Sequence, residues 1–317
     1  MSSRTYEPIE PLTVAFIGLG VMGRLMSANL AAGGYTVRSY DLNGGGNCKS
    51  AKEAANGARV LITMLPDGAA VRKAVAAALP GLEPGAVVID MSSSDPVGTR
   101  ELEKELRKKQ VLLLDAPVSG AKGGAKDATL AIMVGGDRAI LDHVRPVLEK
   151  MGNRVYYCGP LGAGHALKAL NNYIGAAGTI AAFEAVLVGK AFGLDPALMV
   201  DVINNSTGYN STTQRKLPQQ VLTNAFASGF SAALMTKDVG IAEGIAGAMK
   251  VPAPYLKATS KLWREALRRL PTGADHTEMF RFLEQLRTPS RAAAARRSSS
   301  RQKPRRSSAA AGRRRRA

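Results

Sequence analysis

The chain has 317 residues, of which 45% are hydrophobic and 21% charged. This length allows two domains with sizeable cores, and its two cysteines, Cys48 and Cys158, match neither a disulfide framework nor a metal site. The formal net charge of +18 is concentrated in residues 287–317, where 12 Lys and Arg occur without an acid, so the rest carries only +6.

From residue 12 to residue 163 the sequence alternates short apolar runs with helical stretches. We expect strands at 12–18, 35–41, 59–66, 86–92, 111–119, 130–136 and 154–159. We expect helices at 22–32, 68–78, 96–108 and 138–150, with Asp67 and Asp95 as N-caps of the second and third. Near-continuous apolar strands joined by helices predict an α/β, Rossmann-type doubly wound domain with a largely parallel sheet covered on both faces.

After this domain the pattern becomes helical. Residues 164–193 are predicted to form one helix about 40 Å long that joins the domains. Helices are expected at 195–205, 215–223, 232–248, 253–270 and 276–286, which predicts an all-α domain over 194–286. We expect this domain to serve substrate binding and oligomerisation. Ligands of open α/β sheets bind beyond the carboxyl ends of the strands, and the long helix starts right after the last strand, so its first turns are expected to reach that crevice.

The two ends of the chain are predicted to be appendages. Residues 1–11 lack the basic start and apolar run of a signal peptide, so we expect a cytoplasmic protein. Residues 287–317 have no apolar period and are predicted to be disordered. Such a basic tail is able to contact nucleic acid through counterion release, although a solvated appendage is the plainer interpretation. Glu184 and Lys190 interrupt the apolar segment 174–193, so no membrane span is expected.

A glycine motif follows the first predicted strand and opens a helix. Gly18 would allow the tight turn, Gly20 the approach of a pyrophosphate, and Gly23 the close packing of helix on strand. Leu19, Val21 and Met22 occupy the positions between them. Asp41 ends the second strand, where a carboxylate accepts hydrogen bonds from a ribose diol and repels a 2′-phosphate. The motif predicts NAD, with NADP less favoured, while the plainer interpretation makes Asp41 a turn residue.

Lys168 and Asn172 lie one turn apart on the long helix, so they share a face of it. An ammonium beside a carboxamide on an otherwise apolar helix is suited to meet a ligand, although lysines on such helices are more often solvated. A lysine whose pKa is lowered in a partly apolar site is able to move the proton that hydride transfer requires.

Five ordered motifs carry a resemblance to a known family: GLGVMGRLMSANL, MLPD, APVSGAKGGA, GAGHALKALNN and LMTKD. Residues 12–286 resemble the β-hydroxyacid dehydrogenases, and within them the 3-hydroxyisobutyrate dehydrogenase and tartronate semialdehyde reductase group. The resemblance implies a catalytic role for Lys168 and Asn172. It implies that Ser119 and Gly120 bind the substrate carboxylate. It also implies that Lys237 and Asp238 lie near substrate and nicotinamide, and that Leu65, Pro66 and Ser93 line the cofactor.

Two regions depart from the family pattern. The segment after Asp41 is shorter than in relatives and contains Gly44-Gly45-Gly46, which form a helix poorly, so the adenine pocket is expected to be altered. Ala121 and Ala128 stand where glycine is usual, so the substrate loop is strained if either position requires a positive φ.

The main hypothesis is an NAD-dependent oxidoreductase of short β-hydroxy acids that forms a homodimer or homotetramer. A second is an NADPH-dependent reductase of glyoxylate or succinic semialdehyde, against which stands Leu42, where an arginine would hold the 2′-phosphate. A third is an inactive dehydrogenase-like protein associated with nucleotides or, through the tail, with nucleic acid. None of the three hypotheses requires a bound metal.

Overall fold

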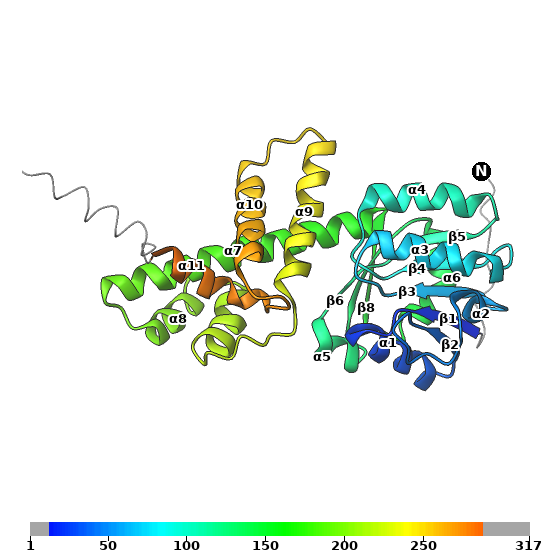
Figure 1. Cartoon of the computed structure of the whole chain (residues 1–317), viewed down its shortest axis with the longest axis horizontal. Helices are drawn as coiled ribbons and strands as arrows, with labels where there is room; N and C mark the ends of the chain where they lie inside the picture. The colour runs from blue at the N-terminus through cyan, green and yellow to red at the C-terminus, as the bar shows by residue number, and fades with distance from the viewer. Residues whose placement is uncertain (1–12, 288–317) are drawn as a thin grey trace, which may run out of the picture.

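The computed structural model describes residues 13–287, which form an α/β body and a helical body joined by one long helix, α7 (Ala163–Phe192). Figure 1 shows α7 leaving the sheet and running through the helical body. The predictions made for residues 1–11 lie outside the described residues, as do those for the basic tail 287–317 apart from Arg287, which ends helix α11 (Met279–Arg287).

The sheet has eight strands in the order β2-β1-β3-β4-β5-β7-β6, with β8 on β7. The strands are β1 (Thr13–Ile17), β2 (Thr36–Tyr40), β3 (Val60–Thr63), β4 (Val87–Asp90), β5 (Leu112–Asp115), β6 (Val118–Ser119), β7 (Ala131–Gly135) and β8 (Arg154–Gly159). The first five strands in this order are parallel, whereas β7 is antiparallel to β5 and β6 and parallel to β8. The prediction of a largely parallel sheet is confirmed, with β7 as the reversed strand.

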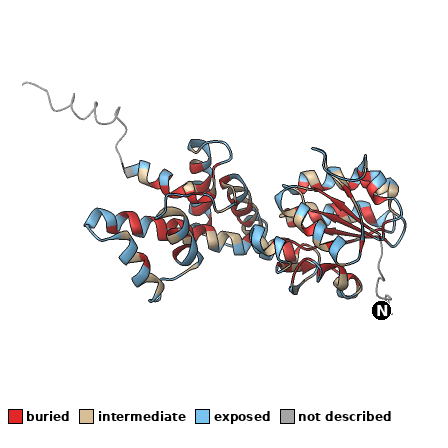
Figure 2. Ribbon diagram, turned by 90° about the horizontal axis from the view of Figure 1, so that it is seen from below, coloured by how far each residue is buried: buried red, intermediate tan, exposed pale blue. Residues whose placement is uncertain are grey.

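Helices cover both faces of the sheet, as the apolar strands require. They are α1 (Val21–Ala32), α2 (Ala51–Ala55), α3 (Gly68–Ala78), the short η1 (Leu79–Gly81), α4 (Pro96–Arg107), α5 (Ala121–Lys126) and α6 (Arg138–Leu148). Along β1, Val14 and Phe16 face a core shared with α1, α5 and α6, while Ala15 and Ile17 face α2, α3 and α4. Figure 2 shows the buried strands between helices with exposed outer faces. This is the doubly wound arrangement, and the predicted α/β fold class is confirmed.

Three expectations about the elements of the α/β body need correction. The single strand predicted for 111–119 is divided into β5 and β6 at Ala116-Pro117, because proline has no N–H for the ladder. Two short helices, α2 and α5, were not expected. Ser50 starts α2 by accepting the Glu53 N–H, and the Glu53 carboxylate accepts the N–H of Lys49, one residue before the N-cap.

The helical body packs around its own core. It contains α8 (Pro196–Asn204), η2 (Thr212–Val221), α9 (Ala232–Ala248), α10 (Pro254–Arg269), η3 (His276–Glu278) and α11 (Met279–Arg287). The helix predicted for 215–223 starts three residues earlier and is a π-helix with Pro218 inside it, where the missing N–H disfavours α-helical bonding. Phe183 of α7 and Trp263 of α10 lie in this core. At the other end of α7, Gly164 lies against the Met133 carbonyl of β7, so the helix packs in both bodies.

By length and hydropathy alone, α7 could cross a membrane, but half of its most apolar 18-residue window is buried inside the protein. That burial is typical of the core helix of a folded body.

Candidate active site

The three motif glycines have distinct environments at the carboxyl end of β1. Gly18 has φ +99°, and a Cβ there would collide with the Met64 carbonyl. A Cβ on Gly23 would collide with the Gly18 carbonyl, so α1 needs glycine to pack on the turn. A Cβ on Gly20 would meet no atom within 4 Å, so its backbone is open to a ligand. With the amides of the first turn of α1 facing that side, this geometry fits a dinucleotide pyrophosphate.

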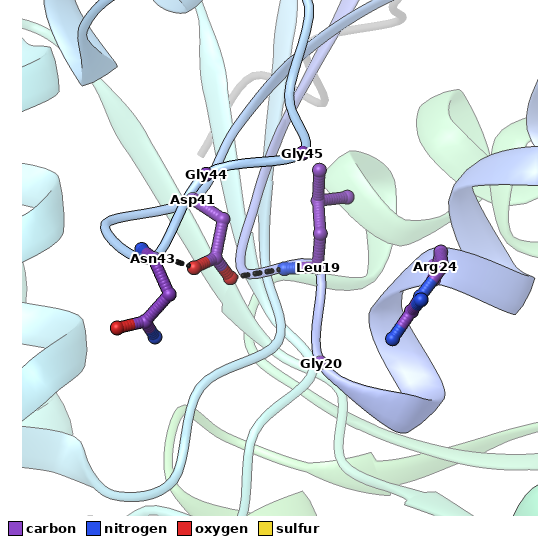
Figure 3. A pocket seen from close by; sticks show the side chains of 7 residues that line it. All are labelled: Leu19, Gly20, Arg24, Asp41, Asn43, Gly44 and Gly45. Atoms are coloured by element: carbon purple, nitrogen blue, oxygen red, sulfur yellow. Dashed lines mark hydrogen bonds between the residues drawn. The ribbon is translucent and has the colours of Figure 1, made fainter.

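The carboxylate of Asp41 is held against this turn. Its Oδ2 accepts the Leu19 N–H at 2.6 Å and its Oδ1 accepts the Asn43 N–H at 2.7 Å, as Figure 3 shows. Asp41 lines a pocket of about 390 Å³ whose other walls are Leu19, Gly20, Arg24, Asn43, Gly44 and Gly45. The residue therefore does more than start a turn, and each oxygen keeps a lone pair for a ribose hydroxyl.

Between the motif glycines, Val21 is exposed at the start of α1, and Met22 packs against the sheet core. Both begin the helix whose free amides face the ligand side.

Lys168 and Asn172 lie on α7 beside the α9 pair Lys237–Asp238. Asn172 donates its Nδ2–H to Asp238 Oδ2 at 2.6 Å, and Lys237 Nζ lies 3.1 Å from Asp238 Oδ1. Asp238 is only 2% exposed. This pair is therefore part of an interhelical cluster and not the exposed ion pair that the sequence also allowed.

The ammonium of Lys168 has no hydrogen-bond or ion-pair partner within the described part of the chain. Burial lowers its pKa from the ordinary lysine value, the charge of Lys237 lowers it further, and the carboxylate of Asp238 opposes both. A half-buried amine with a lowered pKa and no fixed partner gives up its proton to a ligand more readily than an ordinary lysine does.

Lys237 connects the helical body to the two loops expected to line the cofactor. Its Nζ donates to the Pro66 carbonyl at 2.9 Å and to the Ser93 carbonyl at 2.5 Å. Pro66 follows β3 and Ser93 follows β4, so both lie at the carboxyl edge of the sheet. Leu65 lies in the first of these loops and touches the position where a Gly18 side chain would be. The cluster on α7 and α9 is thus joined to the loop that lies against the glycine turn after β1.

A buried polar junction fixes the start of α7, and sequence reasoning missed it. Asp115, at the end of β5, accepts the N–H groups of Gly162 and His165, both at 2.7 Å. The His165 ring contacts the Ser92 carbonyl at 3.1 Å and the Thr99 hydroxyl at 2.9 Å. Since Gly162 has no side-chain cap of its own, Asp115 satisfies the first amides of α7 from a different element.

The loop predicted to hold a carboxylate is the turn from β6 into α5. Ser119 is half-buried, Gly120 has φ +143°, and α5 packs against α1 through the Asn29–Ala125 hydrogen bond at 2.7 Å. In the described chain no hydrogen bond joins Ser119 or Gly120 to Lys168 or Asn172.

Ala121 and Ala128, which flank α5, both have φ +52°. The strain expected for alanine at these two positions is therefore present in this loop.

The structure thus joins Asn172, Asp238, Lys237, Pro66 and Ser93 directly, with Lys168 beside them. Asp41 and the glycine turn form a second group, and Ser119 with Gly120 a third. Arg24 and Asn43 were missed as pocket residues. Arg24 was detectable in principle, because it follows Gly20 by one helical turn and so shares its face. Over residues 13–287, no group of three or more His, Cys, Asp or Glu side chains is placed to hold a metal ion.

Comparison with known proteins identifies the families that the two bodies match. Residues 13–159 match the family described as the NAD binding domain of 6-phosphogluconate dehydrogenase. Residues 162–283 match the family described as NAD-binding of NADP-dependent 3-hydroxyisobutyrate dehydrogenase. The fold and the matched regions define an NAD-binding dehydrogenase that acts on CH–OH groups.

Individual relatives are similar over nearly their whole length. A probable 3-hydroxyisobutyrate dehydrogenase of Mycobacterium bovis is 40% identical over 84% of this chain and 94% of its own. The NAD-dependent L-serine dehydrogenase of Pseudomonas aeruginosa is 35% identical over 80% of this chain and 92% of its own. The structure of Mycobacterium tuberculosis 3-hydroxyisobutyrate dehydrogenase with L-serine superimposes with a TM-score of 0.80 at 36% identity, covering 88% of this chain and 100% of that one.

The chain belongs to the β-hydroxyacid dehydrogenase family, as the five motifs suggested. It is an NAD-dependent oxidoreductase of β-hydroxy acids.

Proposed function

We propose that the protein oxidises a β-hydroxy acid carrying a primary alcohol, with Lys168 as the acid–base group. The observation that carries this proposal is the half-buried, unpartnered ammonium of Lys168 beside the Asn172–Asp238–Lys237 cluster, which is tied to the loops after β3 and β4. The same cleft supports the reverse reaction, reduction of the semialdehyde.

In the oxidation direction, the neutral amine of Lys168 takes the proton of the substrate hydroxyl, and in reduction its ammonium returns that proton. Bound NAD supplies the acceptor for the hydride that leaves the carbinol carbon. Glycines 18, 20 and 23 with Asp41 hold the phosphates and ribose, and Leu65, Pro66 and Ser93 line the nicotinamide side.

The neighbours of Lys168 have supporting roles in this proposal. Asn172, fixed by Asp238, hydrogen-bonds the substrate oxygen without adding charge. Lys237 holds the Pro66 and Ser93 loops in place and keeps the Lys168 pKa low. Ser119 and the Gly120 amide bind the substrate carboxylate, which sets the distance between that group and the reacting carbon.

Two relatives, a probable 3-hydroxyisobutyrate dehydrogenase and an L-serine dehydrogenase, support this class of substrate. 3-Hydroxyisobutyrate and L-serine share a carboxylate and a CH₂OH on the same carbon and differ in the third substituent, methyl or ammonium. Turnover of 3-hydroxyisobutyrate, L-serine, glycerate and 4-hydroxybutyrate with NAD and with NADP tests this class. Exclusive use of NADPH on glyoxylate or succinic semialdehyde would favour the reductase alternative, and no turnover in either direction would contradict both.

The role of Lys168 has a matched control on the same helix. Lys168→Ala is expected to lower kcat by about two to four orders of magnitude, as removal of a positioned acid–base group does, while NADH fluorescence titration still shows binding. Lys190→Ala removes an exposed lysine of α7 that pairs with Glu284 at 3.3 Å, and it should leave kcat unchanged. Full activity of Lys168→Ala would refute the assignment.

We further propose a homodimer or homotetramer in the cytoplasm, built from the units 12–163, 164–193 and 194–286. Ile174, Val188 and Phe192 repeat along one side of α7 and are 70%, 69% and 84% exposed. A continuous apolar face on a long helix supports burial against a second copy. Light scattering after size exclusion should give a multiple of the chain mass, and Ile174→Asp should reduce it; a monomeric wild type would end this proposal.

A further inference from the structure

The pocket at the glycine turn contains a cation, Arg24, which directly follows the last glycine of the motif. Arg24 lies on the first turns of α1 and lines the same pocket as Asp41 and Gly20, and Figure 3 shows it beside the Leu19–Gly20 turn. Among residues 13–287 its side chain has no hydrogen-bond or ion-pair partner. Asp41, the acid of this pocket, already uses both oxygens to accept the Leu19 and Asn43 amides. The guanidinium is therefore uncompensated by any fixed contact.

The part of the pocket wall formed by Gly44 and Gly45 has no side chains. Gly44 and Gly45 have φ of +89° and +90°, and a Cβ on either would meet no atom within 4 Å. Leu42, before them, is 87% exposed and is not among the residues that line the pocket. The shortened segment between β2 and α2 thus contributes backbone and the Asn43 side chain, but no cation, to hold an anionic cofactor.

The position of Arg24 gives it a defined target. It follows Gly20 by four residues, so its Cα lies one turn above the open face of that glycine, and helical side chains lean towards the N-terminus. The side chain therefore extends towards the place where the amides at the start of α1 face an anion. A guanidinium there is suited to a phosphate, because its planar fork donates two parallel hydrogen bonds.

We propose that Arg24 binds a phosphate group of the dinucleotide cofactor and supplies affinity that the shortened β2–α2 segment does not. This inference rests on the NAD-binding role of the glycine turn, and it adds the side chain of Arg24 to the residues that hold the cofactor. The phosphate is either the pyrophosphate of NAD or the 2′-phosphate of NADP. The two cases predict that loss of Arg24 weakens the binding of different adenine nucleotides.

The test measures binding, independently of turnover. Displacement of NADH fluorescence by adenosine, 5′-AMP and 2′-AMP is compared between the full-length wild type and Arg24→Ala. A charge-assisted phosphate contact predicts that Arg24→Ala weakens the phosphorylated ligand about 10- to 100-fold while adenosine changes much less. Selective loss of 5′-AMP and NADH assigns the pyrophosphate. Selective loss of 2′-AMP and NADPH assigns the 2′-phosphate and makes NADP an accepted second cofactor.

Two further variants control for charge and folding. Arg24→Lys keeps the charge and should recover part of the affinity. Arg59→Ala removes an exposed arginine just before β3, at the amino edge of the sheet, so it controls for net charge and should leave all three affinities unchanged. Equal weakening of adenosine and both nucleotides by Arg24→Ala, or no weakening at all, would overturn the proposal. If the proposal about Arg24 fails in this way but the protein still shows Lys168-dependent turnover at saturating NAD, the proposed function stands.

Discussion

The junction at the start of α7 makes a sharp prediction about Asp115. Its two carboxylate oxygens accept two buried amides, those of Gly162 and His165. Asp115→Asn leaves one oxygen and turns an NH₂ group towards the other amide, so one bond is lost and one buried donor is unsatisfied. A hydrogen bond to a charged group contributes about 1.5–3 kcal/mol and an unsatisfied buried group costs about 1–3 kcal/mol. We expect the free energy of unfolding to fall by about 3 kcal/mol.

The control is Asp195→Asn at the start of α8. Asp195 is exposed and accepts a single amide, Leu198 N–H, at 2.8 Å. Asparagine caps exposed helices about as well as aspartate, so this change should cost less than about 0.5 kcal/mol. Urea titration followed by circular dichroism measures both. If the two variants lose equal stability, Asp115 does not anchor α7 in the way described here.

Three other predictions concern strain and titration. Ala128→Gly should raise the free energy of unfolding by about 0.5–1 kcal/mol, because its φ of +52° disfavours alanine; a lower melting temperature would contradict this. The pH profile of kcat/KM for oxidation should rise with pH to a plateau, with a midpoint below the ordinary lysine value, because burial lowers the pKa of Lys168. Lys237→Met should move that midpoint upward, because the charge of Lys237 lowers the pKa of Lys168. An unmoved midpoint would show that Lys237 does not influence the pKa of Lys168. Burial also lowers the pKa of Lys216 to about 8, so the folded state holds this proton less tightly than the unfolded chain does. Stability should therefore rise between about pH 8 and 10.5, and Lys216→Met should remove that rise in urea midpoints measured across the window.

Local sequence patterns were enough to predict the elements that carry a recognisable motif or periodicity. The order of strands and helices, the glycine turn with Asp41 and the long helix with Lys168 all follow from spacing within a few residues. The possible strain at Ala121 and Ala128 was also foreseeable, since both stand at glycine positions. These features are encoded close together in the chain, so a single sequence reveals them.

Contacts between distant segments were not predictable in this way. Asp115 caps a helix that starts 47 residues later, and nothing near Asp115 in the sequence distinguishes it from any strand-ending acid. Lys237 reaches Pro66 across 171 residues. Pairings of this kind depend on how the two bodies pack, which only the folded chain specifies.

The attachment of α7 has a mechanical consequence. A helix of 30 residues is about 45 Å long, so tilting it by about 5° about its root displaces its far end by about 4 Å. Lys168 lies only five residues from that root, about 8 Å along the axis, and the same tilt moves it by less than about 1 Å. The amine that we propose as the acid–base group therefore lies close to the anchored end of α7, and a small tilt of the helix that displaces its far end leaves Lys168 almost in place.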